Sequence, residues 1–261
     1  MPANVSLAYH YDGSFEGFLC CVFESYDRRE IPSAIFSEEP DQLSLLPVKQ
    51  IVTDREKAYR VLSSIPEKIS PHAASVVQIC FLSCHPQKEL LLLKFLRLGY
   101  KVGHALTRRL ADPLVSEVMK MELFVQNEMH FFKEFLRFSD YGGVLTSVIH
   151  PKNFVLPLIR EHYCTRFPNE SIFIYDANHK AAFFYRDHRY EFFSVESFEP
   201  PEPGEEEKFY RTLWKEYYDA IAIEGRYNPK CRMTRMPKRY WGDMTEFQEV
   251  GHRSIGAGKA R

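Results

Sequence analysis

The spacing of apolar residues changes near residue 134, and this change constrains the fold more than any other feature of the chain. Between 54 and 133, apolar residues recur every three or four positions, as they do on the buried face of a helix. The helices of this region begin at residues that favour helix starts: Asp54, Ser70 before Pro71, and Asp112 before Pro113. Residues 54–133 are therefore predicted to form a layer of helices, the last of which reaches about Lys133.

Residues 1–53 combine strand-like and helical patterns. Val5–Tyr11 has the composition of a short strand, and Ser14 can cap the helix that follows it. Within the helical layer, a helix that starts near Pro86 is expected to end at Gly99, because glycine commonly follows the last helical residue.

Downstream of residue 134, strand-like segments alternate with turn signals. Glu134–Tyr141 and Val144–His150 flank Gly142-Gly143, whose glycines allow the positive φ angles of a tight hairpin. A helix is expected over Pro151–Phe167. It precedes three further strand-like segments: Ser171–Tyr175, Ala181–Arg186 and Tyr190–Val195. Such local pairing favours an antiparallel sheet with one covering helix, so the predicted fold class is α+β.

Charge is segregated after the last of these segments. Residues 196–207 carry six glutamates and three prolines, which predicts an extended acidic linker. Lys208–Ile223 has apolar residues at helical spacing, and this helix is expected to dock the following tail onto the body. The chain then divides into these parts, which could also form one compact domain: a mainly helical region at 1–133, the sheet region at 134–195, the linker at 196–207, a C-terminal helix and tail at 208–249, and a disordered end at 250–261.

The run from Arg226 to Trp241 carries six Lys or Arg side chains and no acidic one, in a chain whose formal net charge is -1. Aromatic residues interrupt this run, a pattern typical of a surface for phosphates and stacked bases. In an alternative interpretation the rings pack on the core while the cations point outward. The residues predicted to contact nucleic acid are Arg232, Arg235, Lys238, Arg239, Tyr240, Trp241 and, upstream of the run, Arg137.

Composition limits the class of protein. The chain is 45% hydrophobic, but no stretch approaches about 18 uninterrupted apolar residues and the N-terminus lacks a leader-like pattern. We therefore expect a cytoplasmic protein that is not embedded in a membrane. Six cysteines lack the spacing of a disulfide framework. Cys80, Cys84 and His85 come nearest to a metal site, yet no second ligand pair stands at suitable spacing, so neither a metal nor a cofactor is predicted.

Five segments carry a family resemblance: Y-D-G-S-F-E-G-F-L-C-C-V-F-E at 11–24, L-R-L-G-Y-K-V-G at 96–103, E-F-L-R-F at 134–138, L-W-K-E-Y-Y-D-A-I-A-I-E-G-R-Y-N-P-K at 213–230, and M-P-K-R-Y-W at 236–241. Together they resemble a bacterial family described as "probable DNA metabolism protein". Members of that family are encoded beside a radical SAM protein of DNA modification or repair, and a similar C-terminal module is fused to uracil-DNA glycosylase-like domains. The resemblance implies a DNA-repair context, with DNA and the radical SAM protein as partners, but no catalytic set.

Candidate catalytic residues come from the middle of the chain, since the zinc-deaminase and phosphate-loop patterns are missing from the sequence. Glu128 and His130 lie near the end of the long predicted helix, where His130 could act as a general acid or base. Alternatively, Glu134 one turn further on satisfies this histidine. His162 and Arg166 form an i,i+4 pair on the covering helix, and they face either solvent or a ligand.

Three functions follow as hypotheses. The preferred one is a DNA-binding accessory protein of DNA modification or repair that acts with a radical SAM partner. The second is a DNA-processing enzyme, lyase or glycosylase-like, that uses His130 or His162 as general acid or base. The third is a structural adaptor that binds protein only.

Overall fold

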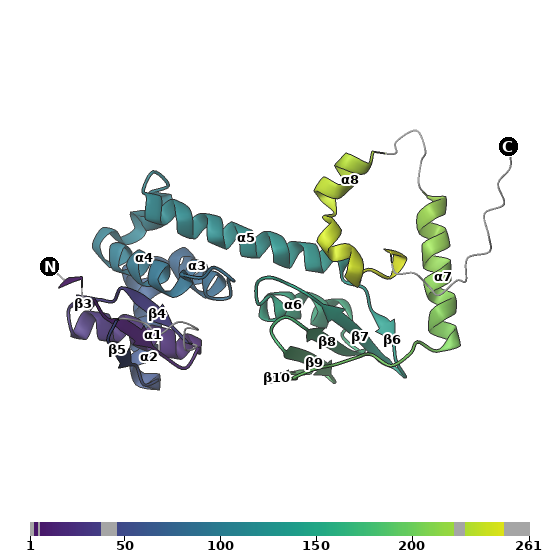
Figure 1. The fold of residues 1–261 in the computed structure, drawn as a ribbon, viewed down its shortest axis with the longest axis horizontal. Helices are drawn as coiled ribbons and strands as arrows, with labels where there is room; N and C mark the ends of the chain where they lie inside the picture. The colour runs from purple at the N-terminus through teal and green to yellow at the C-terminus, as the bar shows by residue number, and fades with distance from the viewer. Residues whose placement is uncertain (1–2, 5, 38–45, 222–227, 248–261) are drawn as a thin grey trace. The chain divides into compact units, whose positions relative to one another are not determined.

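A computed structural model describes residues 3–4, 6–37, 46–221 and 228–247. Its contacts divide the chain into two compact units, 1–127 and 128–261, and the boundary falls within the long helix α5 (Pro113–Phe135). Figure 1 shows helices and strands in both units. The predicted α+β class, with a helical N-terminal half and a sheet in the C-terminal half, is confirmed.

The N-terminal unit contains a three-stranded parallel sheet in which β2 (Ala8–His10) lies between β4 (Ala34–Phe36) and β5 (Val48–Gln50). A second parallel pair joins β1 (Ala3–Asn4) to β3 (Glu30–Ile31). Helices supply most of the buried residues of this unit: α1 (Phe15–Asp27), α2 (Arg55–Lys68), α3 (Pro71–Phe81), α4 (Lys88–Val102), the short 3-10 helix η1 (Gly103–Arg108) and the first part of α5.

The helix starts follow from their capping residues. Ser14, Asp54 and Ser70 each accept a hydrogen bond from a first-turn backbone N–H of α1, α2 and α3. Asp112 accepts one from the backbone N–H of Leu114, at 3.0 Å. These bonds satisfy donors that have no partner inside the helix, so the predicted starts are confirmed.

The predicted end of α4 at Gly99 is wrong, because the helix continues to Val102. A Cβ atom on Gly99 would lie 2.6 Å from the Ile69 side chain and 2.7 Å from that of Leu106, so this glycine permits close packing inside the helix. Gly103 ends the helix instead, with a φ of +61° that favours glycine.

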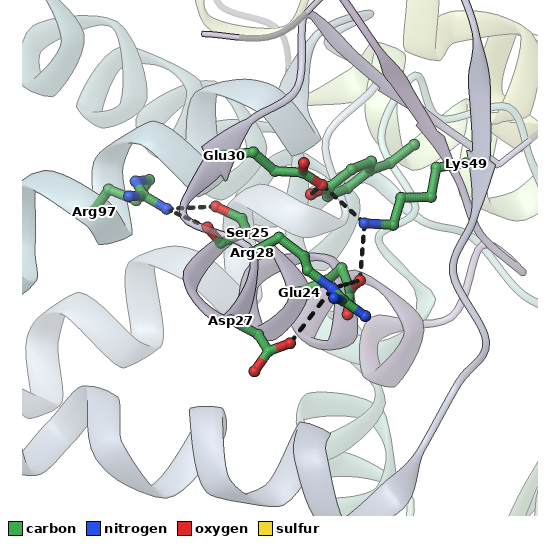
Figure 2. A network of polar contacts seen from close by, with 8 residues as sticks. Glu24, Ser25, Asp27, Arg28, Glu30, Lys49 and Arg97 are labelled. Carbon is green, nitrogen blue, oxygen red and sulfur yellow. Dashed lines mark hydrogen bonds and ion pairs between the residues drawn. The ribbon is translucent and has the colours of Figure 1, made fainter. Parts of the chain in front are cut away.

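A polar network ties α1 to the neighbouring strands of the N-terminal unit (Figure 2). The Lys49 ammonium lies 2.9 Å from a carboxylate oxygen of Glu24 and 2.9 Å from one of Glu30. Arg97, which is buried, donates hydrogen bonds to the carbonyl and the hydroxyl of Ser25, at 3.0 and 2.5 Å. Paired charges at the edge of a core fix the packing of the elements that carry them.

The C-terminal unit is organised around a five-stranded sheet with the order β10-β9-β8-β7-β6. Its strands are β6 (Ser139–Asp140), β7 (Val144–Ile149), β8 (Ser171–Asp176), β9 (Ala181–Arg186) and β10 (Arg189–Ser194). The predicted hairpin at Gly142-Gly143 is confirmed, with φ angles of +65° and +86°. The hairpin that joins β8 to β9 is confirmed as well.

Two details of the predicted sheet are wrong. The pair β7–β8 is parallel, while the other three pairs are antiparallel, because α6 (Leu156–Arg166) connects β7 to β8 and returns the chain to the same end of the sheet. The predicted strand Glu134–Tyr141 is reduced to β6, since α5 continues to Phe135. Phe131 and Phe135 extend the apolar face of α5 by one more turn.

The two faces of the sheet are covered differently. Ile172, Ile174 and Phe183 belong to the core that α6 completes with Ile159 and Tyr163. The other face carries Phe173 and Tyr175, and Phe198 contacts both rings edge-on, at centroid distances of 4.8 and 5.7 Å. The first part of the predicted acidic linker therefore packs on the sheet.

The C-terminal helices follow that segment. They are α7 (Glu205–Ala220), α8 (Pro229–Arg235) and the short 3-10 helices η3 (Lys238–Asp243) and η4 (Thr245–Phe247). The helix predicted over Lys208–Ile223 thus begins three residues earlier. Contrary to expectation, none of the residues of α7 is buried. The helix contacts the body through polar groups: the Arg211 guanidinium donates to the Ser139 hydroxyl at 2.6 Å, and the backbone N–H of Asp140 donates to Glu207 at 3.2 Å.

Candidate nucleic-acid interface

The predicted basic run forms α8 and η3, while Arg226 and Tyr227 lie outside the described residues. Asn228 caps α8 by accepting a hydrogen bond from a backbone N–H of the first turn, at 3.0 Å. Arg235 and Lys238 are exposed. Lys230 of the same run is exposed as well, so these three cations of the described part of the run are accessible to a phosphate.

Tyr240 belongs to the core and does not present its ring to solvent. It is 3% exposed, and its ring centroid lies 5.3 Å from Phe131, 5.2 Å from Phe132 and 6.1 Å from Phe135. Burial raises the pKa of its hydroxyl to about 12. The alternative in which rings of this run pack on the core is confirmed for this residue.

Trp241 also packs within the C-terminal unit. Its ring stacks on Phe247 at a centroid distance of 4.7 Å, and its Nε1 donates to the Met236 carbonyl at 3.1 Å. The Arg232 guanidinium lies 4.7 Å from the centre of the same ring. Among the described residues, Arg232 Nε is the buried side-chain nitrogen that has no hydrogen-bond partner. Trp241 therefore holds the tail in place and engages Arg232.

Glu128 and Arg239, assigned to different roles from the sequence, form one ion pair, of which only the carboxylate is buried. The Arg239 guanidinium lies 3.2 Å from Oε1 of Glu128, whose side chain is 1% exposed. Glu128 also accepts hydrogen bonds from the backbone N–H groups of Lys152 and Asn153, at 3.1 and 2.7 Å, and from the Asn153 side-chain amide at 2.6 Å. This carboxylate organises the loop after β7.

His130 makes the contact that the simpler of its two interpretations predicts. Its Nε2 lies 3.1 Å from a carboxylate oxygen of Glu134, one helical turn on, and its side chain is 67% exposed. The predicted alternative, a histidine satisfied by Glu134, is confirmed.

Arg137 lines a cavity of the C-terminal unit. Its guanidinium donates to both carboxylate oxygens of the buried Glu246, at 2.8 and 3.2 Å, and lies 5.6 Å from the centre of the Trp214 ring. The cavity has a volume of about 710 Å³. We call it the basic cavity, and its lining comes from the end of α5, from α6, from α7 and from η4: Lys133, Glu134, Leu136, Arg137, Phe138, Tyr163, Arg166, Phe167, Glu207, Tyr210, Arg211, Trp214 and Thr245.

Positive charge prevails in the basic cavity, which four cationic side chains and two carboxylates line. Arg137 is paired with Glu246, and the Arg211 guanidinium lies 2.8 Å from Glu207. Lys133 and Arg166 form no ion pair with a carboxylate of the described residues. These two cations are therefore free to pair with an anionic ligand.

The pKa of His162 reflects this excess of positive charge. Burial lowers the pKa of its imidazole, and Lys133 and Arg166 lower it further. The sequence left open whether the His162–Arg166 pair faces solvent or a ligand, and the structure places Arg166 in the wall of the basic cavity.

Beside the basic cavity lies a second one of about 510 Å³, on the sheet face opposite α6. It shares Arg137, Arg211 and Thr245 with the basic cavity. His150, directly after β7, places its Nδ1 2.8 Å from Oδ1 of Asp243, and its backbone N–H donates to Oδ2 at 3.3 Å. We call this second space the histidine cavity.

The geometry of the His150–Asp243 pair suits proton transfer. Burial raises the pKa of Asp243, although the hydrogen bonds from His150 lower it in part. A carboxylate bound to Nδ1 fixes the orientation of the ring and leaves Nε2 for a ligand. Sequence reasoning missed this pair because Asp243 follows 93 residues after His150.

Cys80, which the sequence places nearest to a metal site, has a structural role. Burial raises the pKa of the Cys80 thiol, which donates to the Val118 carbonyl at 3.5 Å. Cys80 is thus a core cysteine. In the part of the chain that the structure describes, no helix is long and apolar enough to cross a membrane.

Comparison with known proteins places the chain in a family. A model of a domain of unknown function, DUF4130, matches residues 86–246, a range that includes every residue of the basic cavity. No curated protein and no solved structure matches the chain. Since the match covers more than half of the chain, the protein belongs to the DUF4130 family.

Proposed function

We propose that this protein is a DNA-binding accessory protein of DNA modification or repair, which acts with a radical SAM partner and holds unpaired nucleotides in the basic cavity. One observation carries the DNA-binding part: four cationic side chains and five aromatic rings line the same open cavity. The resemblance to the DNA metabolism family supports the repair context and the partner.

The cavity offers separate groups for the two parts of a nucleotide. Lys133 and Arg166 are the cations available to phosphate oxygens, while Arg137 and Arg211 keep their carboxylate partners. Tyr210 and Trp214 are partly exposed on α7 and provide ring faces for bases. Stacking of this kind accepts every base, because each base has a π face. The volume lies within the range of about 300–1,000 Å³ that is usual for sites of nucleotide-sized ligands.

The first prediction concerns the two free cations. The double substitution Lys133→Glu/Arg166→Glu is expected to weaken binding of a fluorescein-labelled single strand at least about tenfold at low salt. It should also reduce the slope of log K against log salt by about 1.4, since each lost phosphate contact removes about 0.7 for a single strand. Fluorescence anisotropy at several salt concentrations measures both quantities.

The matched control is Lys208→Glu/Lys215→Glu, which changes the net charge equally on exposed or half-exposed positions of α7 outside the cavity lining. It should retain most of the affinity. Equal loss in both variants would show that overall charge matters and the cavity does not. A wild-type chain that binds no DNA at low salt, with or without the radical SAM protein, would instead favour the protein-only adaptor.

His162, whose ring contacts that of the cavity residue Tyr163, provides a further test. A bound phosphate that neutralises Lys133 and Arg166 should raise the pKa of His162, because both cations lower it in the free protein. An NMR titration of the imidazole with and without a short single strand would reveal that shift.

A second candidate function, DNA processing with a histidine general acid or base, is favoured by the His150–Asp243 pair. The histidine cavity shares two arginines with the basic cavity, so a strand held in one cavity could place a reactive bond in the other. On this proposal His150 takes the role that the sequence assigned to His130 or His162.

The corresponding prediction uses histidine variants on an oligonucleotide that the protein converts. His150→Ala is expected to lower kcat by about 10²–10⁴-fold, the usual contribution of a positioned acid or base, while DNA binding persists. His130→Ala, at an exposed position paired with Glu134, is the control and should keep its kcat. Unchanged turnover in His150→Ala would rule this function out for the histidine cavity.

A further inference from the structure

The apolar residues of α7 form a continuous exposed ridge. Phe209, Leu213, Tyr217 and Ile221 follow one another at intervals of four, and each is between 43% and 59% exposed. The basic cavity uses their neighbours Tyr210 and Trp214 but none of these four residues. The ridge thus adjoins the proposed DNA site, through ring contacts of Phe209 with Tyr210 and of Tyr217 with Trp214, but its own four residues do not line the cavity.

The side of α7 opposite the ridge makes the contacts with the rest of the C-terminal unit. Arg211 and Glu207 hold the helix on β6 through polar contacts, and Tyr218 contacts the Phe247 ring at 5.7 Å. A helix that is attached by its polar side presents its apolar side outward. Large exposed apolar patches of this kind are typical of interaction sites.

A ridge of side chains spaced four apart packs into the grooves of another helix. The charged residues of α7 then determine which kind of partner helix could pack on the ridge. With about 100° between successive residues, Glu205, Glu206 and Glu216 fall on or beside the ridge. Lys208 and Lys215 fall on the opposite side of the helix.

The acidic border of the ridge decides between possible occupants. A second copy of α7 carries the same carboxylates beside the same ridge, and like charges on both sides of the contact disfavour it. Phosphates of nucleic acid are repelled for the same reason. Lys and Arg beside an apolar face would instead complement these carboxylates.

We propose that the Phe209–Leu213–Tyr217–Ile221 ridge of α7 docks a basic amphipathic helix of a partner protein. The apolar face of that helix packs on the ridge, and its flanking cations pair with Glu206 and Glu216. Neither of these carboxylates forms an ion pair with a described residue.

The test uses the full chain and a fluorescein-labelled peptide as long as α7, 16 residues, with Leu on one face and Lys on the other positions. A second peptide carries Glu in place of Lys. The Leu/Lys peptide should bind the wild-type chain at least about tenfold more tightly than the Leu/Glu peptide. Leu213→Asp should reduce that binding about tenfold.

Thr212→Asp is the matched control, since it adds the same charge to an exposed position beside the ridge. It should bind the Leu/Lys peptide like the wild type. Glu206→Lys/Glu216→Lys should reverse the preference toward the Leu/Glu peptide. Equal binding by Leu213→Asp and Thr212→Asp, or failure of both peptides to bind, would overturn the proposal.

Sedimentation and DNA binding separate the remaining outcomes. A concentration-dependent dimer that Leu213→Asp abolishes would overturn the proposal in favour of a second copy. Leu213→Asp should bind single-stranded DNA like the wild type, because Leu213 does not line the basic cavity. Loss of DNA binding together with peptide binding would mean that the ridge belongs to the DNA site, which also contradicts an independent docking surface.

Discussion

Replacing Glu128 by alanine is expected to lower the free energy of unfolding of the C-terminal unit by about 3–5 kcal/mol. The substitution removes a buried carboxylate that accepts three hydrogen bonds from Lys152 and Asn153 and pairs with Arg239. The two backbone N–H groups and the Asn153 side-chain amide would lose this acceptor, and a buried hydrogen-bonding group that loses its partner costs about 1–3 kcal/mol. Urea unfolding followed by circular dichroism measures the change.

Arg239→Ala and the double variant complete the test of Glu128. Because the Arg239 side chain is about a third exposed, its loss should cost less than the loss of Glu128. In the double variant the two effects should not add, since the pair is lost only once. A Glu128→Ala protein as stable as the wild type that had lost an activity would show that Glu128 is catalytic and not structural.

Replacing Tyr240 by alanine is expected to cost about 3–5 kcal/mol of stability, the usual range for deleting a buried aromatic ring. Contacts with Phe131, Phe132 and Phe135 would be lost together. Tyr240→Phe keeps the ring and removes the hydroxyl that accepts a hydrogen bond from Arg239, so it should cost about 0.5–1.5 kcal/mol. Chemical unfolding of both variants separates the ring from its hydroxyl.

The pH dependence of stability gives an independent check on Tyr240. Its pKa is raised from about 10 to about 12 by burial, so the folded chain holds the proton more tightly than the unfolded chain. The stability linked to this proton is fully present below pH 10 and is lost as the pH rises toward 12. Tyr240→Phe should lose less stability than the wild type as the pH rises from 10 toward 12. If Tyr240→Ala weakened DNA binding but left stability unchanged, the ring would have to face a ligand.

Local chemistry made the helical part of the fold predictable. Ser14, Asp54 and Ser70 cap the helices that they were expected to cap, because a short polar side chain is needed wherever first-turn N–H groups lack partners. The position of a glycine predicted the end of a helix less reliably. Gly99 and Gly103 both suit a helix end, and only the packing of Ile69 and Leu106 against Gly99 shows which of them ends α4.

Long-range contacts account for what could not be predicted. The parallel pairing of β7 with β8 depends on the path of α6 across the sheet, which local sequence patterns do not encode. The basic cavity likewise joins residues from Lys133 to Thr245 that are far apart in the chain. Arg137 was identified, but its partner Glu246 follows 109 residues later. For Tyr240 and Trp241 the sequence left base stacking and packing on the core both open, because a basic, aromatic segment has the same pattern whether its rings face a ligand or the core.

The placement of the two tryptophans allows ligand binding to the C-terminal unit to be followed by intrinsic fluorescence. Both tryptophans of the chain lie in this unit. Trp241 is stacked on Phe247 and hydrogen-bonded through Nε1, whereas Trp214 is 39% exposed in the wall of the basic cavity. Iodide should therefore quench the emission of Trp214 and largely spare that of Trp241. A ligand that enters the cavity would shield the quenchable fraction, so occupancy can be followed without any label.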